Sequence, residues 1–478
     1  MASVKAYREG DASAPAFPSA FTVDKKAVLQ VTDIKTNRNK YYAIELHSSA
    51  GGGAGNQYRV FTHYGRTDDL ETNPNAGAKE CRFFADASEA SACYESIYRE
   101  KTSPKKGYKE VSLASSKIGS QQARGTSSGQ LDDKTVAKLK DKGGSTNGAP
   151  KPSALPPAVQ GLVSYIYAEA TEALTTTVAA KITANGIETP LGVLTIGQIE
   201  RGEVILQQLY KLFESKSATP TEMETLSGEF YTAIPHRLGR TRAAISEAVI
   251  DSMADFDAKQ ETLQLMKDML AVSGDGAVLF DARVDAQYSA LRCNIAALDK
   301  ATPMFRELEQ YVLRSQLKSK NIKVQNIYTL MRDEEWTAYD GKVGNERLLY
   351  HGSRIKNWVG LLSRGILLPK IVVSMGVHRT DPGWLGNGIY FGDAACTSAF
   401  YTTAGKKGTR FMAIARVALG KMAPFTKITY GLAEPPAGFD SCHGVRNVAG
   451  KPSQFADDEF VVYRPNRQRM EALVEFTI

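Results

Sequence analysis

Arg347-Leu-Leu-Tyr-His-Gly-Ser353 is the stretch around which the C-terminal part of this chain is organised. Its first four residues are predicted to form a strand that delivers His351, Gly352 and Ser353 to the point where the strand gives way to a loop. A histidine, a glycine and a hydroxyl at a strand end are typical of ligand contacts in α/β and α+β enzymes. The tripeptide alone occurs by chance in many chains, so its meaning depends on the sequence that follows.

Short β-rich runs dominate the chain after Lys300. The predicted strands are residues 347–350, 389–391, 411–419, 460–463 and 473–478. A short helix is predicted over residues 357–363, and Gly365 is well placed as its C-terminal cap. Residues 300–478 are therefore predicted to form an α+β domain, which holds all candidate catalytic residues.

Residues 21–115 are predicted to form a small α+β module, after a short flexible lead at residues 1–20. Tyr42, Ile44 and Leu46 alternate with other side chains as in a strand, and Gln57-Tyr-Arg-Val-Phe-Thr62 is a second strand-like run. One face of a helix follows, formed by Ala90, Cys93, Tyr94, Ile97 and Tyr98.

Residues 116–153 are predicted to be a basic, flexible linker. The surrounding stretch 101–151 holds eleven Lys or Arg and four Asp or Glu, an excess equal to the formal net charge of +7 of the whole chain. Serine, glycine and glutamine are frequent, as in disordered segments. A solvated linker explains this composition, and the alternative is that it also attracts the phosphate backbone of DNA.

Residues 154–290 are predicted to form an all-α bundle. The apolar stripes at helical spacing are Val159, Leu162, Val163, Ile166 and Ala170, then Ile205, Leu206, Leu209, Tyr210 and Phe213, then Leu263, Met266 and Leu270. Pro156 and Pro157 favour a helix start. Stripes of this kind form a core and do not indicate a cofactor site.

The totals indicate an intracellular protein of two to four domains. The chain has 478 residues, of which 42% are apolar and 23% are charged, and this length exceeds one ordinary core. No apolar run of about 18 residues exists, so no membrane span is expected, and residues 1–18 lack the apolar core of a signal peptide. Five scattered cysteines without a Cys-x-x-Cys pair indicate reduced thiols and argue against a zinc module, so no metal is expected.

The segment from His351 onward resembles the catalytic domain of the poly(ADP-ribose) polymerases. Beside the opening tripeptide, the matching pieces are Asn357, Gly386-Asn-Gly-Ile-Tyr-Phe391, Ser398-Ala-Phe-Tyr401 and Asp458-Glu-Phe-Val-Val-Tyr463. Their order and spacing match the His-Tyr-Glu triad of that family at His351, Tyr390 and Glu459. A Rossmann dehydrogenase is disfavoured, because Gly386-Asn-Gly388 lacks the third glycine of that fingerprint.

The preceding regions resemble other domains of the same family. The bundle resembles the helical regulatory domain at Thr189-Pro-Leu-Gly-Val-Leu194 and Leu226-Ser-Gly-Glu-Phe-Tyr-Thr-Ala-Ile-Pro-His236. The N-terminal module resembles a WGR domain at Asn39-Lys-Tyr-Tyr42 and Tyr64-Gly65-Arg66. The resemblance implies a multi-domain α+β protein like the compact, DNA-break-dependent members, in which the helical domain restrains NAD entry until DNA is engaged.

NAD+ is the substrate that this resemblance implies. Breaking its nicotinamide–ribose bond creates an oxocarbenium-like sugar and a neutral leaving group, so no general acid is needed, unlike in ordinary glycoside hydrolysis. One carboxylate suffices to stabilise the developing charge and to polarise the acceptor. Glu459 is the candidate; without the other motifs it would read as a solvated strand-edge residue beside Asp457 and Asp458.

The resemblance assigns the remaining site residues to NAD+ binding. Gly352 lacks a Cβ, so its backbone can approach the carboxamide closely, and Ser398 adds a hydroxyl. Tyr401 lies three residues later, on the same helical face, and would stack on the nicotinamide. The rest of the set is His351 and Ser353 at the adenosine ribose, Tyr390 beside the nicotinamide, and Asn357.

Three positions near this site depart from the family pattern. Leu367 stands where many members have an Arg near the adenine, and Thr397 stands where a Lys is common. Gly383 stands where a second stacking tyrosine is expected. Trp384 beside it is a candidate to supply the missing aromatic stacking surface. These changes bear on NAD+ affinity and chain elongation more than on the basic activity.

Tyr64 and Arg66 are the candidate DNA-binding residues. Tyr64 stands at the usual tryptophan of the WGR motif. By resemblance it would stack on a nucleotide at a DNA end, and Arg66 would bind a phosphate or support the loop. The alternative is a purely structural aromatic residue in a turn.

The whole sequence predicts a DNA-break-dependent ADP-ribosyltransferase that modifies proteins, itself included, and elongates poly(ADP-ribose). The alternatives are a mono-ADP-ribosyltransferase, against which Glu459 argues, and a DNA-end-binding scaffold with weak catalysis. Expected partners are broken double-stranded DNA ends, acceptor proteins and an accessory factor that completes the acceptor site, with no membrane. The expected location is the nucleus in a eukaryote and the cytoplasm or nucleoid otherwise.

Overall fold

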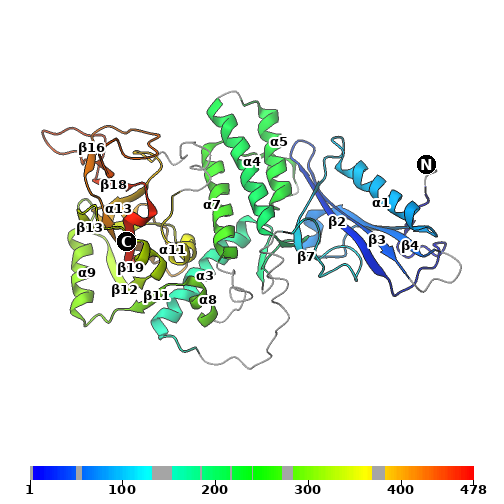
Figure 1. The fold of residues 1–478 in the computed structure, drawn as a ribbon, viewed down its shortest axis with the longest axis horizontal. Coiled ribbons are helices and arrows are strands. Elements are labelled where there is room, and N and C mark those ends of the chain that lie inside the picture. Colours follow the sequence, from blue (N-terminus) through cyan, green and yellow to red (C-terminus); the bar gives the residue numbers. More distant parts are fainter. Residues whose placement is uncertain are drawn as a thin grey trace. The chain divides into compact units, whose positions relative to one another are not determined.

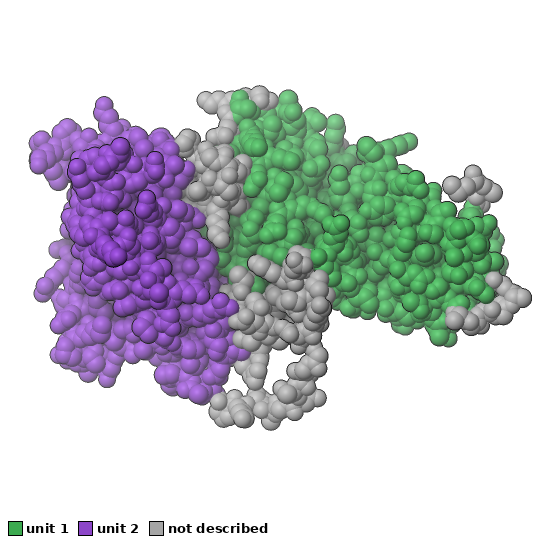
Figure 2. All heavy atoms as spheres, viewed as in Figure 1, with its two compact units in different colours: residues 1–146, 174–270, 274–280 green, residues 147–173, 271–273, 281–478 purple. Residues whose placement is uncertain are grey.

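The computed structural model describes residues 4–49, 56–131, 153–183, 186–215, 218–239, 241–271, 284–368 and 383–478. The chain divides into two compact units (Figure 1 and Figure 2). Unit 1 comprises residues 1–146, 174–270 and 274–280, and unit 2 comprises residues 147–173, 271–273 and 281–478. Each unit contains helices and strands, which confirms the predicted multi-domain α+β class. Among the described helices, none combines the length and the apolar character needed to cross a bilayer.

A six-stranded antiparallel sheet forms the N-terminal part of unit 1. Its strands, in spatial order, are β1 (Tyr7–Arg8), β5 (Ala78–Phe84), β4 (Tyr58–Arg66), β3 (Arg38–Ser48), β2 (Thr22–Asp33) and β6 (Lys109–Glu110). Helix α1 (Ala87–Thr102) covers one face of this sheet, and Ala90 and Tyr94 pack into the core beneath it (Figure 1). The predicted helical face is therefore confirmed.

Residues 116–128, which the sequence assigns to a flexible linker, pack against the same sheet. Ile118 and Ala123 are fully buried, and Ser120 donates hydrogen bonds from its N–H and its hydroxyl to the buried carboxylate of Glu45 on β3. These residues are therefore ordered and do not form the predicted flexible linker. A buried carboxylate requires hydrogen-bond donors, and this segment supplies them to Glu45. The predicted linker residues 132–152 lie outside the described residues.

Residues 4–20 also lie against this sheet, in contrast to the predicted flexible lead. Strand β1 pairs with β5. The guanidinium of Arg59 lies 4.4 Å from the ring centroid of Phe17 and 4.7 Å from that of Phe21. Strand pairing and cation–π contacts thus order a segment whose small and polar composition suggested a free lead.

Helices carry most of the chain between residues 157 and 291. They are α3 (Pro157–Thr177), α4 (Ile196–Ser215), α5 (Pro220–Ala233), α6 (Arg242–Ser246), α7 (Met253–Ala271) and α8 (Val284–Leu291). Three short strands, β8 (Lys181–Thr183), β9 (Gly186–Glu188) and β10 (Gly192–Leu194), interrupt the predicted all-α region. Gly186 and Gly192 adopt φ angles of 132° and 147° there, which no helix accommodates.

The N-terminal module and the helices of unit 1 share a second sheet. Strand β7 (Leu113–Ser116) pairs with β10 in the order β7-β10-β9-β8. The N–H of Thr32 on β2 donates to the hydroxyl of Thr232 on α5 over 2.8 Å, and the N–H of Ser112 donates to Gln198 on α4 over 3.1 Å. These buried links make the two sequence regions one compact unit.

His236, at the end of the Leu226–His236 motif, is a buried neutral imidazole in unit 1. Its Nδ1 donates to the carbonyl of Ile234 over 2.7 Å, because a carbonyl oxygen only accepts. The rings of Phe230 and Tyr231 pack around it. Burial, reinforced by the nearby charge of Lys259, lowers the pKa of His236 to about 3.

The buried His236 predicts a loss of stability in acid. An unfolded histidine titrates near pH 6.5, so between about pH 6.5 and pH 3 the unfolded state binds more protons than the folded state. The contribution of His236 is complete above pH 6.5, and it falls by about 1.4 kcal/mol per pH unit below that value. Denaturant unfolding of the full chain from pH 7 to pH 4.5 should show this slope, and His236→Gln should make it shallower. Equal slopes for the two proteins would contradict the assignment.

Unit 2 is built on a nine-stranded sheet. In spatial order the strands are β11 (Asn294–Ala297), β12 (Lys323–Met331), β19 (Gln468–Thr477), β15 (Arg410–Ala418), β13 (Glu346–Gly352), β14 (Ile389–Gly392), β18 (Glu459–Val462), β17 (Ser441–Gly444) and β16 (Met422–Phe425). Only β16 and β17 pair in parallel among these strands. The short helices are α9 (Pro303–Arg314), α10 (Asp333–Ala338), α11 (Trp358–Arg364) and α13 (Ala395–Ala399). The predicted strands are confirmed, as is the helix that Gly365 caps.

Residues 157–173 of α3 also belong to unit 2. The ring of Tyr165 packs against Phe411 of β15 with a centroid distance of 6.0 Å, and its hydroxyl accepts from the N–H of Lys407 over 3.1 Å. The carboxylate of Glu169 accepts from the N–H of Lys406 over 2.7 Å. Helix α3 is thus packed on the loop that leads into β15.

Candidate active site

The three residues of the predicted triad lie on three adjacent strands. His351 is on β13, Tyr390 on β14 and Glu459 on β18, and β14 lies between the other two. The Nδ1 of His351 donates to the carbonyl of Tyr390 over 2.9 Å. Sheet pairing therefore brings together residues that are more than a hundred positions apart in the sequence.

The side chain of Tyr390 is anchored by the turn that precedes its strand. Its hydroxyl donates to the carbonyl of Gly386 over 2.6 Å and accepts from the N–H of Leu385 over 3.0 Å. A Cβ at Gly383 would lie 2.3 Å from the same hydroxyl, so this position excludes a tyrosine in the present arrangement. Trp384 packs edge-on against Phe455, with a centroid distance of 5.9 Å, and so contributes to the core beside the site.

Gly352 and Ser398, the predicted carboxamide contacts, touch each other. A Cβ on Gly352 would lie 1.9 Å from the carbonyl oxygen of Ser398. The Ser398 hydroxyl donates to the carbonyl of Tyr350 over 3.2 Å, and Ser398 is only 4% exposed. Glycine at position 352 therefore lets helix α13 lie directly on the end of β13.

Tyr401 and its neighbour Phe400 present exposed rings beside this contact. Tyr401 is 58% exposed and Phe400 is 81% exposed. The N–H of Tyr401 donates to the carbonyl of Ser398 over 3.2 Å, in the turn that ends α13. Large exposed aromatic surfaces beside polar groups are suited to stacking on a flat ligand.

Ser353 and Asn357 lie together just after β13. The side-chain amide of Asn357 donates to the Ser353 hydroxyl over 3.3 Å. Asn357 ends a 3-10 turn, Ile355–Asn357, that leads into α11. The two polar groups thus form a small cluster directly after His351 and Gly352.

Glu459 begins β18, between two strands that present glycines to it. Its register partners are Gly392 on β14 and Gly444 on β17. Directly opposite residues share a face of the sheet, so neither register partner adds a side chain next to Glu459, and the Phe455 ring lies where a Cβ on Gly444 would stand. The sequence motifs do not indicate that these two glycines lie opposite Glu459, because strand register cannot be read from the sequence.

The candidate DNA-binding residues have protein partners on β4. The ring of Tyr64 stacks on Tyr42, with centroids 5.2 Å apart and planes 10° apart, and its hydroxyl donates to Glu80 over 2.8 Å. Arg66 pairs with Asp68 over 3.1 Å. The structure thus gives both side chains a structural role in unit 1.

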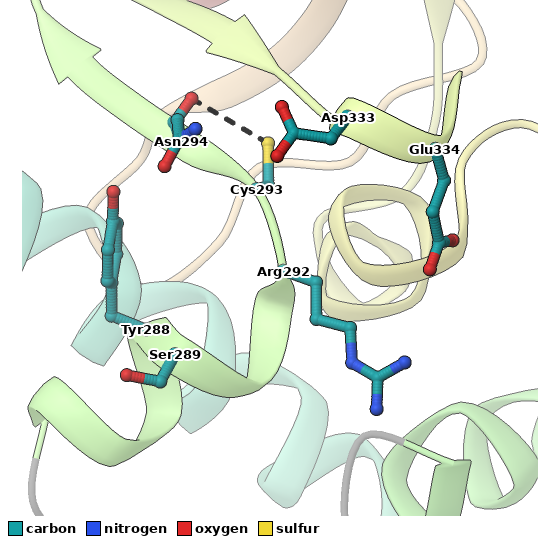
Figure 3. A pocket seen from close by; sticks show the side chains of 7 residues that line it. All are labelled: Tyr288, Ser289, Arg292, Cys293, Asn294, Asp333 and Glu334. Atoms are coloured by element: carbon teal, nitrogen blue, oxygen red, sulfur yellow. Dashed lines mark hydrogen bonds between the residues drawn. The ribbon is translucent and has the colours of Figure 1, made fainter. Parts of the chain in front are cut away.

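A separate cavity of about 290 Å³ in unit 2 has no counterpart in the sequence analysis (Figure 3). It is lined by Tyr288, Ser289, Arg292, Cys293, Asn294, Asp333 and Glu334. Burial raises the pKa of the Cys293 thiol to about 12, so the cavity has no reactive thiolate. In the described part of the chain, no group of three or more His, Cys, Asp or Glu residues is arranged to hold a metal ion.

Comparison with protein-family models gives three matches along the chain. A poly(ADP-ribose) polymerase catalytic domain matches residues 302–478, a poly(ADP-ribose) polymerase regulatory domain matches residues 153–274, and a WGR domain matches residues 25–115. The matches follow one another in the order that the motifs predict.

Individual proteins are similar over long stretches. The protein mono-ADP-ribosyltransferase PARP4 of Homo sapiens is 35% identical over 68% of this chain and 18% of its own length. The protein mono-ADP-ribosyltransferase PARP3 of Homo sapiens is 24% identical over 95% of this chain and 87% of its own length. Poly [ADP-ribose] polymerase 2 of Homo sapiens is 27% identical over 61% of this chain and 54% of its own length. The chain spans less than a fifth of the PARP4 proteins of mouse and human.

Proposed function

Because this chain belongs to the poly(ADP-ribose) polymerase family, we propose that it transfers ADP-ribose from NAD+ to protein acceptors, itself included. The observation that carries the proposal is the adjacency of His351, Tyr390 and Glu459 on β13, β14 and β18. Gly352 and Ser398 hold the carboxamide in this proposal, and the adenosine ribose is bound by His351 and the Ser353–Asn357 pair. The nicotinamide ring stacks on Tyr401.

The reaction needs one carboxylate beside the breaking bond. As the bond between nicotinamide and the ribose C1′ lengthens, the nicotinamide leaves as a neutral molecule and the ribose gains positive charge. The Glu459 carboxylate stabilises that charge and accepts a hydrogen bond from the incoming acceptor. The register partners of Glu459 are Gly392 and Gly444, so the Ser398 hydroxyl beside Gly392 lies on the same face of the sheet as this carboxylate.

We further propose that DNA ends control this activity. The WGR match over residues 25–115 supports DNA binding by the N-terminal module, with Tyr64 and Arg66 as the candidate contacts. In this proposal the Tyr64 ring, one face of which is stacked on Tyr42, stacks on a base, and Arg66, which is paired with Asp68, binds a phosphate. The proposed acceptors are chromatin or other DNA-bound proteins, with the chain in the nucleus of a eukaryote, and an accessory factor would complete the acceptor site.

The product is proposed to be either a poly(ADP-ribose) chain or a single ADP-ribose unit on each acceptor site. Elongation of poly(ADP-ribose) is favoured by Glu459, because mono-transferring members of the family usually lack that residue. Single transfer is favoured by the relatives that are named mono-ADP-ribosyltransferases, PARP3 and PARP4. A ladder on a denaturing gel after incubation with NAD+ supports elongation, and one discrete band supports single transfer.

NAD+ turnover by the full chain, with and without a short 5′-phosphorylated duplex, tests this proposal. Turnover is expected to rise at least about ten-fold with the duplex, which corresponds to an activation free energy lower by about 1.4 kcal/mol. The same duplex with both ends closed as hairpins is the control. Equal rates under all conditions would contradict control by DNA ends. DNA binding without any turnover would favour the scaffold alternative.

A further inference from the structure

Asp457, two residues before Glu459, is a buried carboxylate on which three segments of unit 2 converge. It is 7% exposed. Its Oδ2 accepts from the Thr397 hydroxyl on α13 over 2.6 Å, and its Oδ1 lies 2.9 Å from the Nζ of Lys318, which follows α9. We call Asp457, Thr397 and Lys318 the Asp457 junction.

The Asp457 junction connects the two halves of the candidate site. Thr397 directly precedes Ser398, whose backbone contacts Gly352. Asp457 precedes Glu459 by two residues. The hydrogen bond between Thr397 and Asp457 therefore links the proposed carboxamide contact at Ser398 to strand β18, which carries Glu459. Loss of this link would remove one contact between α13 and the entry to β18, which is also paired with β14.

Asp458, which directly precedes β18, is held by a second set of contacts. Asp458 accepts from Nε2 of His443 over 2.7 Å and from the N–H of Arg446 over 3.0 Å. The ring of His443 is also stacked on Phe460, with a centroid distance of 4.6 Å. A buried carboxylate is costly unless it is paired and hydrogen-bonded, so the buried Asp457 requires its partners. Asp458 is partly exposed and is paired with His443.

We propose that Asp457 is a positioning residue for ADP-ribosyl transfer, held by Thr397 and Lys318, and that it fixes the Glu459 carboxylate relative to Ser398. This inference rests on the proposed function. Where many family members have a lysine at position 397, this chain has a hydroxyl that reaches Asp457. The cations come from other segments: Lys318 lies 2.9 Å and Arg446 lies 3.9 Å from Oδ1 of Asp457. The threonine at position 397, where a lysine is common in the family, is therefore part of the Asp457 junction.

A matched pair of variants at Thr397 tests the inference. Thr397→Ser keeps the hydroxyl donor, and its kcat and KM for NAD+ should stay within about two-fold of the wild-type values. Thr397→Val keeps the shape but removes the donor, and its kcat should fall about ten-fold while KM stays within about two-fold. Rescue by serine distinguishes positioning through a hydrogen bond from simple packing.

A second pair of variants probes the cation. Lys318→Gln should lower kcat several-fold, and Lys320→Gln, at an exposed lysine of the same loop, should leave kcat unchanged. The combined Thr397→Val and Lys318→Gln variant should lose less than the product of the two single effects, because both act through Asp457. Independent, multiplicative effects would overturn the proposed junction.

Hydrogen–deuterium exchange supplies a readout that needs no turnover. Peptides covering residues 455–462 should exchange faster in Thr397→Val than in Thr397→Ser. Equal kcat and equal exchange in these two variants would overturn the inference even if the wild-type chain is active. A kcat loss accompanied by a rise in KM and a lower melting temperature would assign the junction to stability alone. A wild-type chain that cleaves no NAD+ would instead overturn the proposed function.

Discussion

Replacing Glu459 by Gln is expected to lower NAD+ turnover by a factor of about 10² to 10⁴, the usual size of a lost acid–base group. The amide has the same shape but no charge, so it cannot stabilise a positive ribose. Because glutamine matches glutamate in size, the substitution causes no steric conflict. Turnover and nicotinamide binding are measured on the same protein, and binding should stay within about two-fold.

Glu307→Gln is the matched control for this variant. Glu307 is an exposed carboxylate on α9 of the same unit, and its loss should leave turnover unchanged. Retention of full modification activity by Glu459→Gln would remove the catalytic role from Glu459. The neighbouring Asp457, which is buried, and Asp458, which is partly exposed, would then be the carboxylates to examine next.

Gly352→Ala is expected to lower turnover about a hundred-fold, the cost of misplacing reacting groups by about 1 Å. The new Cβ would lie 1.9 Å from the carbonyl oxygen of Ser398, so α13 has to move off the end of β13. Overpacking of this kind also costs about 1–3 kcal/mol of folding free energy. Calorimetric titration with nicotinamide should show weaker binding, because the two carboxamide contacts separate.

Gly161→Ala controls for the change from glycine to alanine itself. Gly161 lies in α3, and a Cβ there meets nothing within 4 Å. Alanine is expected to stabilise that helix by about 0.5–1 kcal/mol and to leave turnover unchanged. If Gly352→Ala bound nicotinamide as tightly as the wild-type chain, the carboxamide role of Gly352 would be wrong.

The sequence predicted helices and strands best where the pattern that defines them lies within a few neighbouring residues. The strand and helix of the opening motif, the cap at Gly365 and the apolar helical stripes all depend on neighbours within a few residues. The N-terminal lead and residues 116–128 were misread because their composition is polar and small. Their order comes from partners elsewhere in unit 1, such as Phe17 against Arg59 and Ser120 against Glu45.

The sequence by itself determined the family, and it predicted the order of the domains and the residues to consider for the proposed NAD+ site. These follow from short motifs and their spacing, which are properties of the chain before it folds. Only the tertiary structure decided that β14 lies between β13 and β18, and that glycines flank Glu459.

The tertiary structure alone also joined Lys318 to Thr397 through Asp457 and packed Tyr64 onto Tyr42. The physical reason is that strand order, register and buried ion pairs depend on which distant surfaces bury each other. No local pattern of residue types records that choice.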